Sequence, residues 1–505
     1  MENGQLLAAI DLGSNSFRLE IGILEDGHIR RVEYLKETVR QGNGLDAERM
    51  LSKEAMVRGW ECLARFSERL SGFAPKYVRA VATQTLREAK NRDDFLSQAE
   101  KILGFPIEVI SGREEARLIY SGVVNLLPQS EEKRLVVDIG GRSTELILGQ
   151  GFKPQIMESY RVGSVKWSMK YFSDGLFTQN SFEWAEVAAK AVLDEALALY
   201  PKHSWEIAYG SSGTIGAVSD ALQIAGWPED TITREGLDWL KEKLIKSGRV
   251  ETLRLEGVKE DRKPVIGGGL AVLCALFDLM KIDKMHAAQG ALRHGVLYDL
   301  LQREHHTDLR SAMVAALGNR FAVDKAQAER VQKTALTLFK GILDKSSFDL
   351  DQSARLEKKL NWAAYLLEIG TRISHSDFHK HGAYILDNAD LPGFSMSELH
   401  RLSQLILGHR GKLKKLELEL RNQEFMIQLL SLRMAAILCH ARREPDLKGV
   451  SLKSADGSQT GFVIHCKKSW VQQWPQSAHL LREECIAWQK TPWQIDLIET
   501  AGKTV

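Results

Sequence analysis

The sequence predicts an α/β protein that continues into an all-helical domain and ends in a small α+β piece. From residue 1 to about 300, short β-branched runs alternate with longer helical patterns, as is typical of layered α/β folds. From about 301 to 445 these runs fade, and apolar residues recur at helical spacing. Residues 446–505 combine strand and helix patterns again. Three segments with different patterns therefore follow one another along the chain.

The elements of each segment follow from these patterns. Strands of the first segment are predicted at residues 6–13, 18–24, 77–83, 134–141, 145–149 and 206–213. The helical segment shows its clearest periodicity at residues 311–323, 335–343, 360–370 and 398–409. In the last segment, residues 449–466 predict two strands around an Asp456-Gly457 turn, followed by a helix at 479–488 and a strand at 493–499.

Length and composition limit the possible functions. The 505 residues suggest about three domains of ~150 residues each. Hydrophobic residues make up 44% and charged residues 27%, as in ordinary globular proteins. The formal charge of +2 gives no general electrostatic reason to bind DNA, RNA or an anionic membrane. Any polyanion would have to bind at a local patch.

Three features predict a cytoplasmic protein. The five cysteines are scattered without metal-ligand spacing, which indicates reduced thiols. The amino terminus lacks a basic region, and Asp11 interrupts its apolar stretch, so we expect no secretory signal. The longest apolar run, Val265–Phe277, is shorter than the roughly 20 residues of a membrane span and predicts a buried helix. Peripheral association with a membrane stays open.

One internal similarity predicts two phosphate-binding loops. Residues 11–22, DLGSNSFRLEIG, and residues 138–149, DIGGRSTELILG, each read as a strand ending in Asp, a small-residue turn and a second strand. Small residues let backbone N–H groups approach an anion, and side-chain donors follow at Ser14, Asn15, Ser16, Ser143 and Thr144. Either Asp can hold a hydrated divalent cation. One copy alone would fit an ordinary turn equally well, but the pair predicts two loops facing each other across a cleft.

A third small-residue turn, residues 210–214, lies between a predicted strand and a predicted helix. Its N–H groups could bind a ligand at the helix N-terminus. A plain strand-to-helix connection with a Ser or Thr cap explains it equally well.

The paired glutamates 114 and 115 begin another predicted helix. Ser111 and Glu114 match a capping box, which gives Glu114 a structural role. Glu115 points about 100° away around the helix and stays free to face the cleft, so we choose it as general base. A solvated surface glutamate is the alternative for Glu115. Arg87 could be a phosphate ligand or a surface charge.

The motifs, in order, resemble those of a known family. DLGSNSFR, ATQTLREA, ISGREEARLIY, DIGG-x-STE, GSSGT and GALRHGVLYD are similar to motifs of the exopolyphosphatase and guanosine pentaphosphate phosphohydrolase family, a branch of the actin, sugar-kinase and heat-shock-ATPase superfamily. The resemblance continues through WAAYLLEIG, HSDFHKHGAYILDNADLPGF and GHRGKL, so it covers nearly the whole chain. Within the family, the sequence looks most similar to proteobacterial exopolyphosphatases.

The resemblance implies a domain organisation. It suggests two ribonuclease-H-like domains of the actin-like ATPase type, at residues 1–120 and 121–303, with the active cleft between them. A helical domain similar to HD-type phosphohydrolases would follow at 304–445, and a small α+β subdomain at 446–505. The resemblance also implies a homodimer.

Site residues carry over onto matching positions. The resemblance gives Glu115 the catalytic role, links Asp138 and Glu145 to a metal, and gives Arg87, Gly140 and Ser143 phosphate contacts. With the loop analysis, Asp11 joins the metal set, for which we expect Mg²⁺, with other divalent cations as alternatives. The full phosphate-binding set is Gly13, Ser14, Asn15, Ser16, Arg87, Gly140, Gly141, Arg142, Ser143, Thr144 and Gly213.

The chain departs from the family pattern at two places. Arg142 replaces the third glycine of the usual DIGGGSTE loop. If this position needs a positive φ, arginine costs conformational energy; otherwise its guanidinium adds a phosphate ligand, which is the interpretation we adopt. Leu367-Glu368 replaces the His-Asp dyad of HD enzymes. We therefore interpret the nearby histidines as remnants, core partners or anion contacts: His375, His379, His381 and His409.

We expect Mg²⁺-dependent hydrolysis of the terminal phosphoanhydride of inorganic polyphosphate, with water activated by Glu115. Hydrolysis of guanosine pentaphosphate is the alternative within the family. A kinase that transfers phosphate to a hydroxyl group and a non-enzymatic nucleotide- or polyphosphate-binding switch are further alternatives.

A long polyanion would need a basic track beyond the cleft. Residues 401–450 contain ten Lys or Arg and five Asp or Glu. They predict either a channel wall or a solvated helix face with ordinary charge pairs. The channel candidates are His409, Arg410, Lys412, Lys414 and Lys415.

Overall fold

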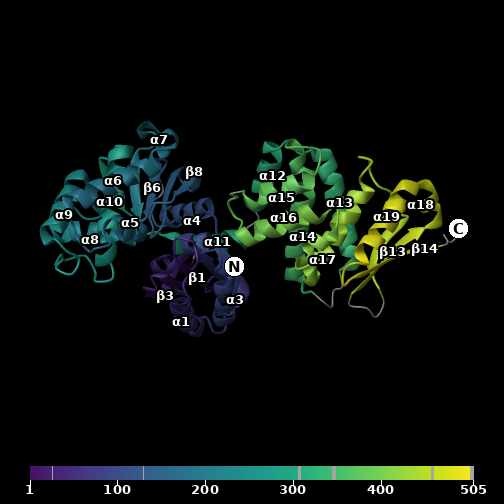
Figure 1. The fold of residues 1–505 in the computed structure, drawn as a ribbon, viewed down its shortest axis with the longest axis horizontal. Coiled ribbons are helices and arrows are strands. Elements are labelled where there is room, and N and C mark those ends of the chain that lie inside the picture. Colours follow the sequence, from purple (N-terminus) through teal and green to yellow (C-terminus); the bar gives the residue numbers. More distant parts are fainter. Residues whose placement is uncertain are drawn as a thin grey trace. The chain divides into compact units, whose positions relative to one another are not determined.

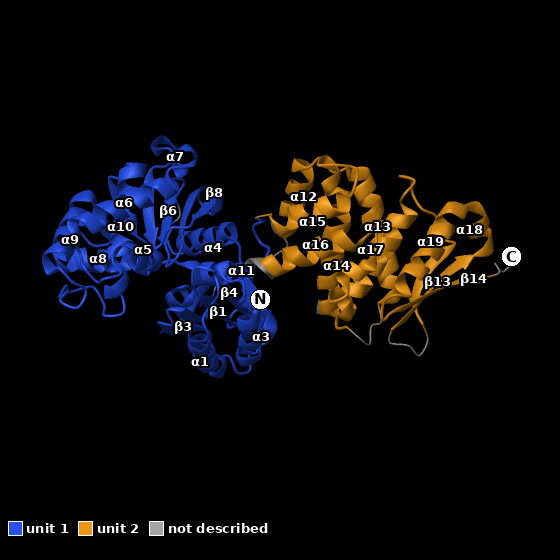
Figure 2. Cartoon of the chain, viewed as in Figure 1, with its two compact units in different colours: residues 1–308, 390–395 blue, residues 309–389, 396–505 orange. Residues whose placement is uncertain are grey.

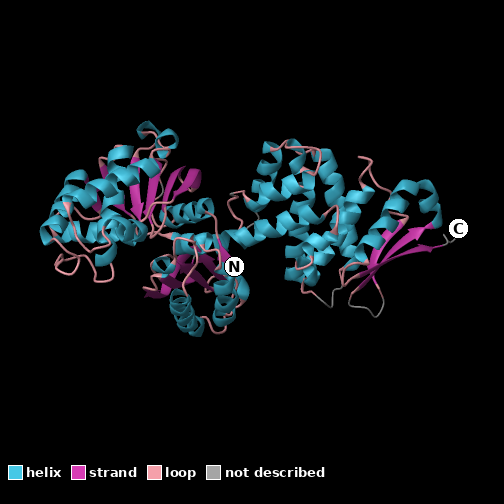
Figure 3. Ribbon diagram, in the orientation of Figure 1, coloured by secondary structure: helices cyan, strands magenta, loops and turns pink. Residues whose placement is uncertain are grey.

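The structure, a computed structural model, describes residues 1–25, 27–128, 130–304, 309–343, 348–389, 391–455 and 460–500. It divides into two compact units (Figure 2). Unit 1 comprises residues 1–308 and 390–395, and unit 2 comprises residues 309–389 and 396–505. Two of the three sheets belong to unit 1 (Figure 3).

The first lobe of unit 1 is built on a five-stranded sheet with the order β3-β2-β1-β4-β5 (Figure 1). Its strands are β1 Leu6–Leu12, β2 Phe17–Glu25, β3 His28–Glu37, β4 Val78–Ala82 and β5 Ile107–Val109. Its helices are η1 Gln41–Gly44, α1 Lys53–Arg69, η2 Pro75–Tyr77, α2 Gln84–Glu88 and α3 Arg92–Leu103. The first three strands form an antiparallel meander, and β4 then runs parallel to β1.

The second lobe repeats this arrangement around a six-stranded sheet, β10-β11-β9-β6-β7-β8. Its strands are β6 Lys133–Ile139, β7 Thr144–Gln150, β8 Lys153–Tyr160, β9 Ile207–Ser211, β10 Thr231–Thr233 and β11 Lys284–Ala287. β6, β7 and β8 form the meander, and β9 runs parallel to β6. The similarity of residues 11–22 and 138–149 thus corresponds to the same strand-turn-strand in two sheets.

Helices cover the second sheet and fill the space beside it. They are α5 Ser164–Tyr171, α6 Gln179–Leu193, α7 Ala196–Leu199, η3 Lys202–Ser204, α8 Ser212–Ile224, α9 Arg234–Ser247 and α10 Lys263–Met280. Among the described residues, α10 is the one helix long and apolar enough to cross a membrane. It packs against α5 and α6 and is mostly buried, so the predicted buried helix is confirmed.

Two helices, α4 Gly112–Val124 and α11 Leu292–Glu304, join the lobes. They pack on each other; α4 also contacts β7 and β8, whereas α11 contacts β1. Their buried apolar residues form one cluster with residues of both sheets, including Leu7, Val81, Val136 and Ile147. Residues 292–303, expected in the second domain, therefore pack against the first sheet.

Unit 2 has a helical part and a small sheet. Its helices are α12 Leu309–Arg320, α13 Lys325–Ile342, α14 Leu350–Tyr365, η4 Ile369–Arg372, α15 Phe378–Asp387, α16 Met396–Gly408, η5 Leu413–Leu416, η6 Glu419–Arg421 and α17 Gln423–Leu438. β12 Val450–Ser454 and β13 Gly461–Lys467 are antiparallel, and β14 Gln494–Thr500 lies parallel to β13. α18 Lys468–Gln473 and α19 Pro475–Trp488 separate β13 from β14. The predicted Asp456-Gly457 turn lies outside the described residues.

Candidate functional site

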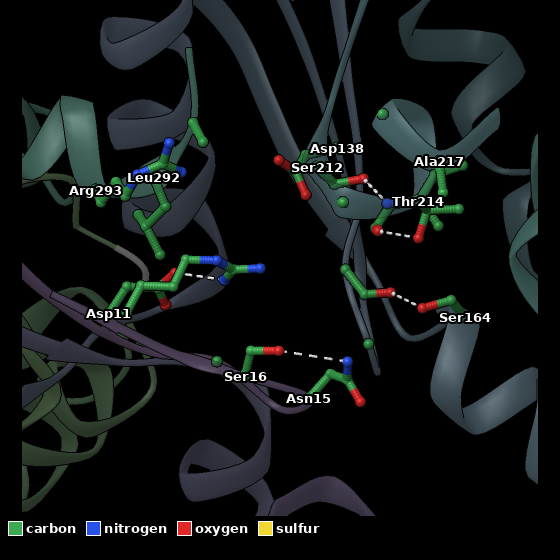
Figure 4. A pocket seen from close by; sticks show the side chains of 18 of the residues that line it. Asp11, Asn15, Ser16, Asp138, Ser164, Ser212, Thr214, Ala217, Leu292 and Arg293 are labelled. Atoms are coloured by element: carbon green, nitrogen blue, oxygen red, sulfur yellow. Dashed lines mark hydrogen bonds and ion pairs between the residues drawn. The ribbon is translucent and has the colours of Figure 1, made fainter. Parts of the chain in front are cut away.

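A cavity of about 360 Å³ opens in unit 1 where β1 and β6 end. This volume is in the range of small-molecule sites, roughly 300–1,000 Å³. Asp11 and Asp138 approach the same space from different strands (Figure 4). The predicted residues that line it are Asp11, Gly13, Ser14, Asn15, Ser16, Glu115, Asp138, Gly140, Gly141, Ser143 and Gly213. The two loops thus share one cavity, and the third turn reaches it too.

The first loop is held in place by neighbouring backbone and side-chain groups. The Gly42 N–H donates to the Ser14 carbonyl at 2.7 Å, and the Arg40 N–H donates to the Asn15 carbonyl at 2.8 Å. The Thr85 hydroxyl donates to Ser14 Oγ at 2.7 Å. A Cβ at Gly13 would lie 2.9 Å from the Ser16 carbonyl, so the turn is too tight for a larger residue.

The second loop is fastened to the start of α5 and approaches the first loop closely. The N–H groups of Ser164 and Val165 donate to the Gly140 and Gly141 carbonyls at 2.9 and 2.8 Å. A Cβ at Gly141 would lie 3.0 Å from Ser14 Cβ. Glycine at position 141 therefore allows the two loops to meet at the cavity.

Glu115 projects from the first turn of α4 into the cavity and is buried. Arg87 Nη2 donates to its Oε2 at 3.0 Å, and Arg87 Nη1 donates to the Ile110 carbonyl at 2.7 Å. Burial raises the pKa of Glu115 to about 7, with Asp138 and Asp11 adding to the rise and Arg87 opposing it. A carboxylate with this pKa can accept a proton at neutral pH.

Glu114 has a different structural role from the one predicted. Ser111 caps α4 as expected, accepting from the Glu114 N–H at 3.2 Å. The Glu114 carboxylate does not accept a hydrogen bond from the Ser111 N–H, as a capping box would require. It accepts from Arg117 at 2.7 and 2.8 Å and from the Gly393 N–H at 2.6 Å. Arg117 and Arg79 also pair with Asp299 on α11. Glu114 thus anchors α4 in a buried charge network while Glu115 faces the cavity.

The three predicted metal ligands do not form one cluster. Asp11 pairs with Arg18 at 2.9 Å, and burial raises the pKa of Asp138 to about 6. Glu145 does not line the cavity: it is buried behind the loop, where its Oε1 accepts from Ser159 at 2.6 Å and its Oε2 has no partner. Burial, with Glu115 and Asp138 nearby, raises the pKa of Glu145 well above its usual value. Among the described residues, no group of three or more His, Cys, Asp or Glu side chains could hold a metal by itself.

The donor set nevertheless fits Mg²⁺ shared with a substrate. Mg²⁺ usually keeps several waters and binds through one or two carboxylates together with substrate phosphates. Asp11 and Asp138 supply two carboxylates in the cavity wall. Burial raises the pKa of Asp138, and Ser211, Arg18 and Arg293 oppose this rise only in part.

Three predicted phosphate ligands are not among the residues that line the cavity. Arg87 is bound to Glu115, to Gln84 and to the Ile110 carbonyl. Arg142 donates to Glu88 and to the Gly42 carbonyl. Thr144 donates its hydroxyl to the Val162 carbonyl at 2.6 Å. Each of these polar groups is bound to a protein partner in this structure, and their roles as phosphate ligands stay predictions.

Sequence reasoning missed the cations of the cavity wall. Arg18, Lys36, Lys259, Arg262 and Arg293 all line it. Arg18 could have been found, since Asp11 and Arg18 face each other in the β1–β2 register. Arg262 belongs to no motif, and its guanidinium has no hydrogen-bond or ion-pair partner within the described ranges.

The channel candidates lie in unit 2. Arg410, Lys412, Lys414 and Lys415 are exposed, whereas His409 is buried. Burial lowers the pKa of His409 to about 3, and its Nδ1 contacts the Ile406 carbonyl at 2.6 Å. His409 is therefore a core residue that does not face solvent. The four cations lie on the surface of unit 2. That they contact a substrate stays a prediction.

Comparison with known proteins tests the predicted family membership. Residues 22–304 match the Ppx/GppA phosphatase family, and residues 309–485 match its domain III. The chain is 38% identical over 508 residues to "Guanosine-5'-triphosphate,3'-diphosphate pyrophosphatase" of Aeromonas hydrophila, covering 99% of this chain and 100% of the relative. It is 38% identical over 493 residues to the Pseudoalteromonas translucida protein of that name, covering 97% of each.

Solved structures show the same fold. A crystal structure of the Aquifex aeolicus member of the Ppx/GppA family matches with a TM-score of 0.51 and 25% identity, covering 60% of this chain and 99% of that chain. The predicted α/β fold of the actin-like ATPase type is thereby confirmed, as is the family resemblance. Both of these full-length relatives are named "Guanosine-5'-triphosphate,3'-diphosphate pyrophosphatase", and neither is named an exopolyphosphatase. This chain belongs to the Ppx/GppA phosphatase family, whose members hydrolyse phosphoanhydrides.

Proposed function

We propose that this protein is a guanosine pentaphosphate phosphohydrolase, which removes the terminal phosphate of the 5'-triphosphate as orthophosphate. The observation that carries hydrolysis is the buried Glu115 with a pKa of about 7, in a cavity bounded by two phosphate loops. The names of the full-length relatives support this substrate. The substrate that the sequence analysis preferred, inorganic polyphosphate, becomes the second candidate.

The proposed reaction is an in-line attack of water on the terminal phosphorus. N–H groups and hydroxyls of residues 13–16 and 140–143 bind the phosphate oxygens, as nests of successive N–H groups do. Glu115 Oε1 or Oε2 orients the water and accepts its proton as the phosphoanhydride bond breaks. Arg87 holds the Glu115 carboxylate in place at 3.0 Å. When bound through Asp11 and Asp138, Mg²⁺ would neutralise charge on the phosphate oxygens.

The cations of the cavity favour a substrate with more than one anionic group. Arg262 is buried, has no ion-pair partner among the described side chains, and has a pKa lowered by burial and by Arg18. Leaving a guanidinium desolvated without an anion is costly, so an anionic ligand at Arg262 would be strongly favoured. A nucleotide that carries phosphates on two sides of its ribose offers such an anion beyond those held by the loops.

One observation keeps inorganic polyphosphate as the second candidate substrate. The loops present donors for phosphate oxygens and do not by themselves require that the substrate carries a nucleobase. The exposed Arg410, Lys412, Lys414 and Lys415 could bind a longer chain. In the nucleotide proposal these cations have no role.

The test measures orthophosphate released from guanosine pentaphosphate, long-chain polyphosphate and ATP, with and without Mg²⁺. Wild type is compared with Glu115→Gln, which keeps the side-chain shape but cannot accept the proton. We expect Mg²⁺-dependent release that is fastest from guanosine pentaphosphate. Glu115→Gln should lower kcat by about 10²- to 10⁴-fold while binding persists.

The other outcomes identify the alternatives. Faster release from polyphosphate would establish the second candidate. Phosphate transfer only when an acceptor alcohol is present would indicate a kinase. Binding without release from any substrate would indicate a switch protein, and unchanged turnover of Glu115→Gln would remove Glu115 from the mechanism.

A further inference from the structure

Arg142 connects the second phosphate loop to the first lobe. Its Nε and Nη2 donate to Glu88 Oε2 on α2 at 3.1 and 2.9 Å. Its Nη1 donates to the Gly42 carbonyl at 3.1 Å. The Gly42 N–H in turn donates to the Ser14 carbonyl of the first phosphate loop. One side chain therefore joins both loops, with all three of its guanidinium nitrogens in use.

A hydrogen-bond chain runs from this side chain to Glu115. Gln84 Nε2 donates to the other Glu88 oxygen, Oε1, at 2.7 Å. Arg87 Nε donates to Gln84 Oε1 at 2.9 Å, and Arg87 Nη2 donates to Glu115 Oε2 at 3.0 Å. Arg87 Nη2 also donates to Gln84 Oε1, and the chain of hydrogen bonds is continuous from Arg142 to Glu115.

The members of this chain are shielded from water. The side chains of Arg142 and Glu88 are 12% and 10% exposed, and those of Arg87 and Glu115 are 14% and 9% exposed. Charge-assisted bonds in such surroundings hold their geometry better than exposed pairs do. Lys166 is the further cation beside Glu88 and Arg142, and its pKa is lowered by burial. It donates to the Arg161 carbonyl at 3.2 Å, and within the described residues it makes no hydrogen bond to Glu88.

The position tolerates arginine without backbone strain. Arg142 is not among the described residues with positive φ. Glycine is therefore not required at position 142, and the arginine side chain can make its hydrogen bonds without backbone strain.

We propose that Arg142 is a positioning residue, which fixes the carboxylate of Glu115 through Glu88, Gln84 and Arg87 when the two phosphate loops are in contact. This proposal rests on the proposed function, because it requires that Glu115 orients the attacking water. It predicts a specific kinetic effect: loss of Arg142 misplaces the base without removing a phosphate ligand.

The first test replaces Arg142 by Met, which approximates the aliphatic part of the side chain but removes all its donors. With guanosine pentaphosphate, kcat should fall about tenfold or more, because small misplacements of a reacting group are costly, while KM changes by less than about threefold. Arg142→Lys can still pair with Glu88 and should recover most of kcat. Arg234→Met, which removes a half-buried arginine paired with Asp278 and Asp238 in the same unit, is the control and should leave kcat unchanged.

The second test is a double-mutant cycle with Glu88→Gln. The amide retains the shape of Glu88 but cannot pair with a guanidinium charge, so Glu88→Gln should lower kcat as Arg142→Met does. If both act through one chain, the double variant should be no slower than the slower single variant by more than about twofold.

Other results would overturn the proposal. A rise in KM with unchanged kcat for Arg142→Met would make Arg142 a substrate ligand. Fully multiplicative losses in the cycle, or a lower thermal midpoint with unchanged kcat and KM, would leave it a structural residue. The wild type distinguishes failure of the proposed function from failure of this proposal. If the wild type releases no phosphate from guanosine pentaphosphate, the same variants are assayed with long-chain polyphosphate. The proposal then fails only if the kcat pattern is absent there too.

Discussion

Gly213 shows how much one residue can matter in this cavity. A Cβ at this position would lie 2.1 Å from Arg262 Nη2, so the arginine packs directly over the glycine. The glycine was predicted to bind phosphate through its N–H, but the structure gives it another role as well. It makes room for the one buried guanidinium of the cavity wall that has no described partner.

Replacing Gly213 by Ala should displace Arg262 and weaken substrate binding. We expect KM for guanosine pentaphosphate to rise about tenfold, the loss of one charge-assisted contact, with little change in kcat. Gly216→Ala is a matched control, since Gly216 lines the same cavity from the same helix but a Cβ there has nothing within 4 Å. Equal KM values for the two variants in steady-state assays would contradict this role of Gly213.

The pKa of Glu115 makes a prediction about pH. Burial raises this pKa from 4.5 to about 7, and the base must be deprotonated to accept a proton from water. kcat/KM, which reports the free enzyme, should therefore rise with pH through about 7 and level off above it. Measuring kcat/KM from acid to alkaline pH checks this. An acid limb close to the ordinary carboxyl pKa would show that Glu115 is not the titrating base.

At the scale of elements, the strand-turn-strand units were predictable because they are local. The β1–β2 and β6–β7 hairpins could be identified from alternating apolar residues and small turn residues, and their similarity predicted two loops at one cavity. The capping residue Ser111 was also predictable, since its partner lies three residues away. The same local logic separated Glu115 from Glu114.

Partners that are distant in the sequence were not predictable. Arg142 was expected to bind phosphate, but Glu88 lies 54 positions earlier and competes for its guanidinium. The Glu114 carboxylate binds Gly393, 279 positions away. Both cases follow one physical rule: a buried charged group binds the nearest complementary donor or acceptor in space, and periodicity does not reveal which segment provides it.

At the scale of the whole molecule, the exposed cations of unit 2 separate the two candidate substrates. Arg410, Lys412 and Lys414 are exposed. If they bind polyphosphate, Lys412→Glu with Lys414→Glu should lower kcat/KM for long chains about tenfold at low salt and much less at high salt, because screening weakens such contacts. Guanosine pentaphosphate should be affected by less than about twofold.

The control carries the same change of charge elsewhere in unit 2. Lys325 and Lys333 are exposed on α13, and reversing both should leave the two substrates equally affected. The comparison is a ratio of kcat/KM values for long polyphosphate and guanosine pentaphosphate. An unchanged ratio for the Lys412 and Lys414 variant would remove the basic track from the protein's function.

The contact of Gly393 with Glu114 also affects how the chain matures during synthesis. Residues 390–395 belong to unit 1, although the chain on both sides of them belongs to unit 2. A nascent chain that has reached residue 308 contains both large sheets and α4, but the buried Glu114 carboxylate still lacks its Gly393 donor. Domains usually fold as units as they leave the ribosome. Here the helix that carries Glu115 gains its contact with Gly393 only after α15 has been translated, so a segment whose described residues, 391–395, do not line the cavity completes the surroundings of Glu114.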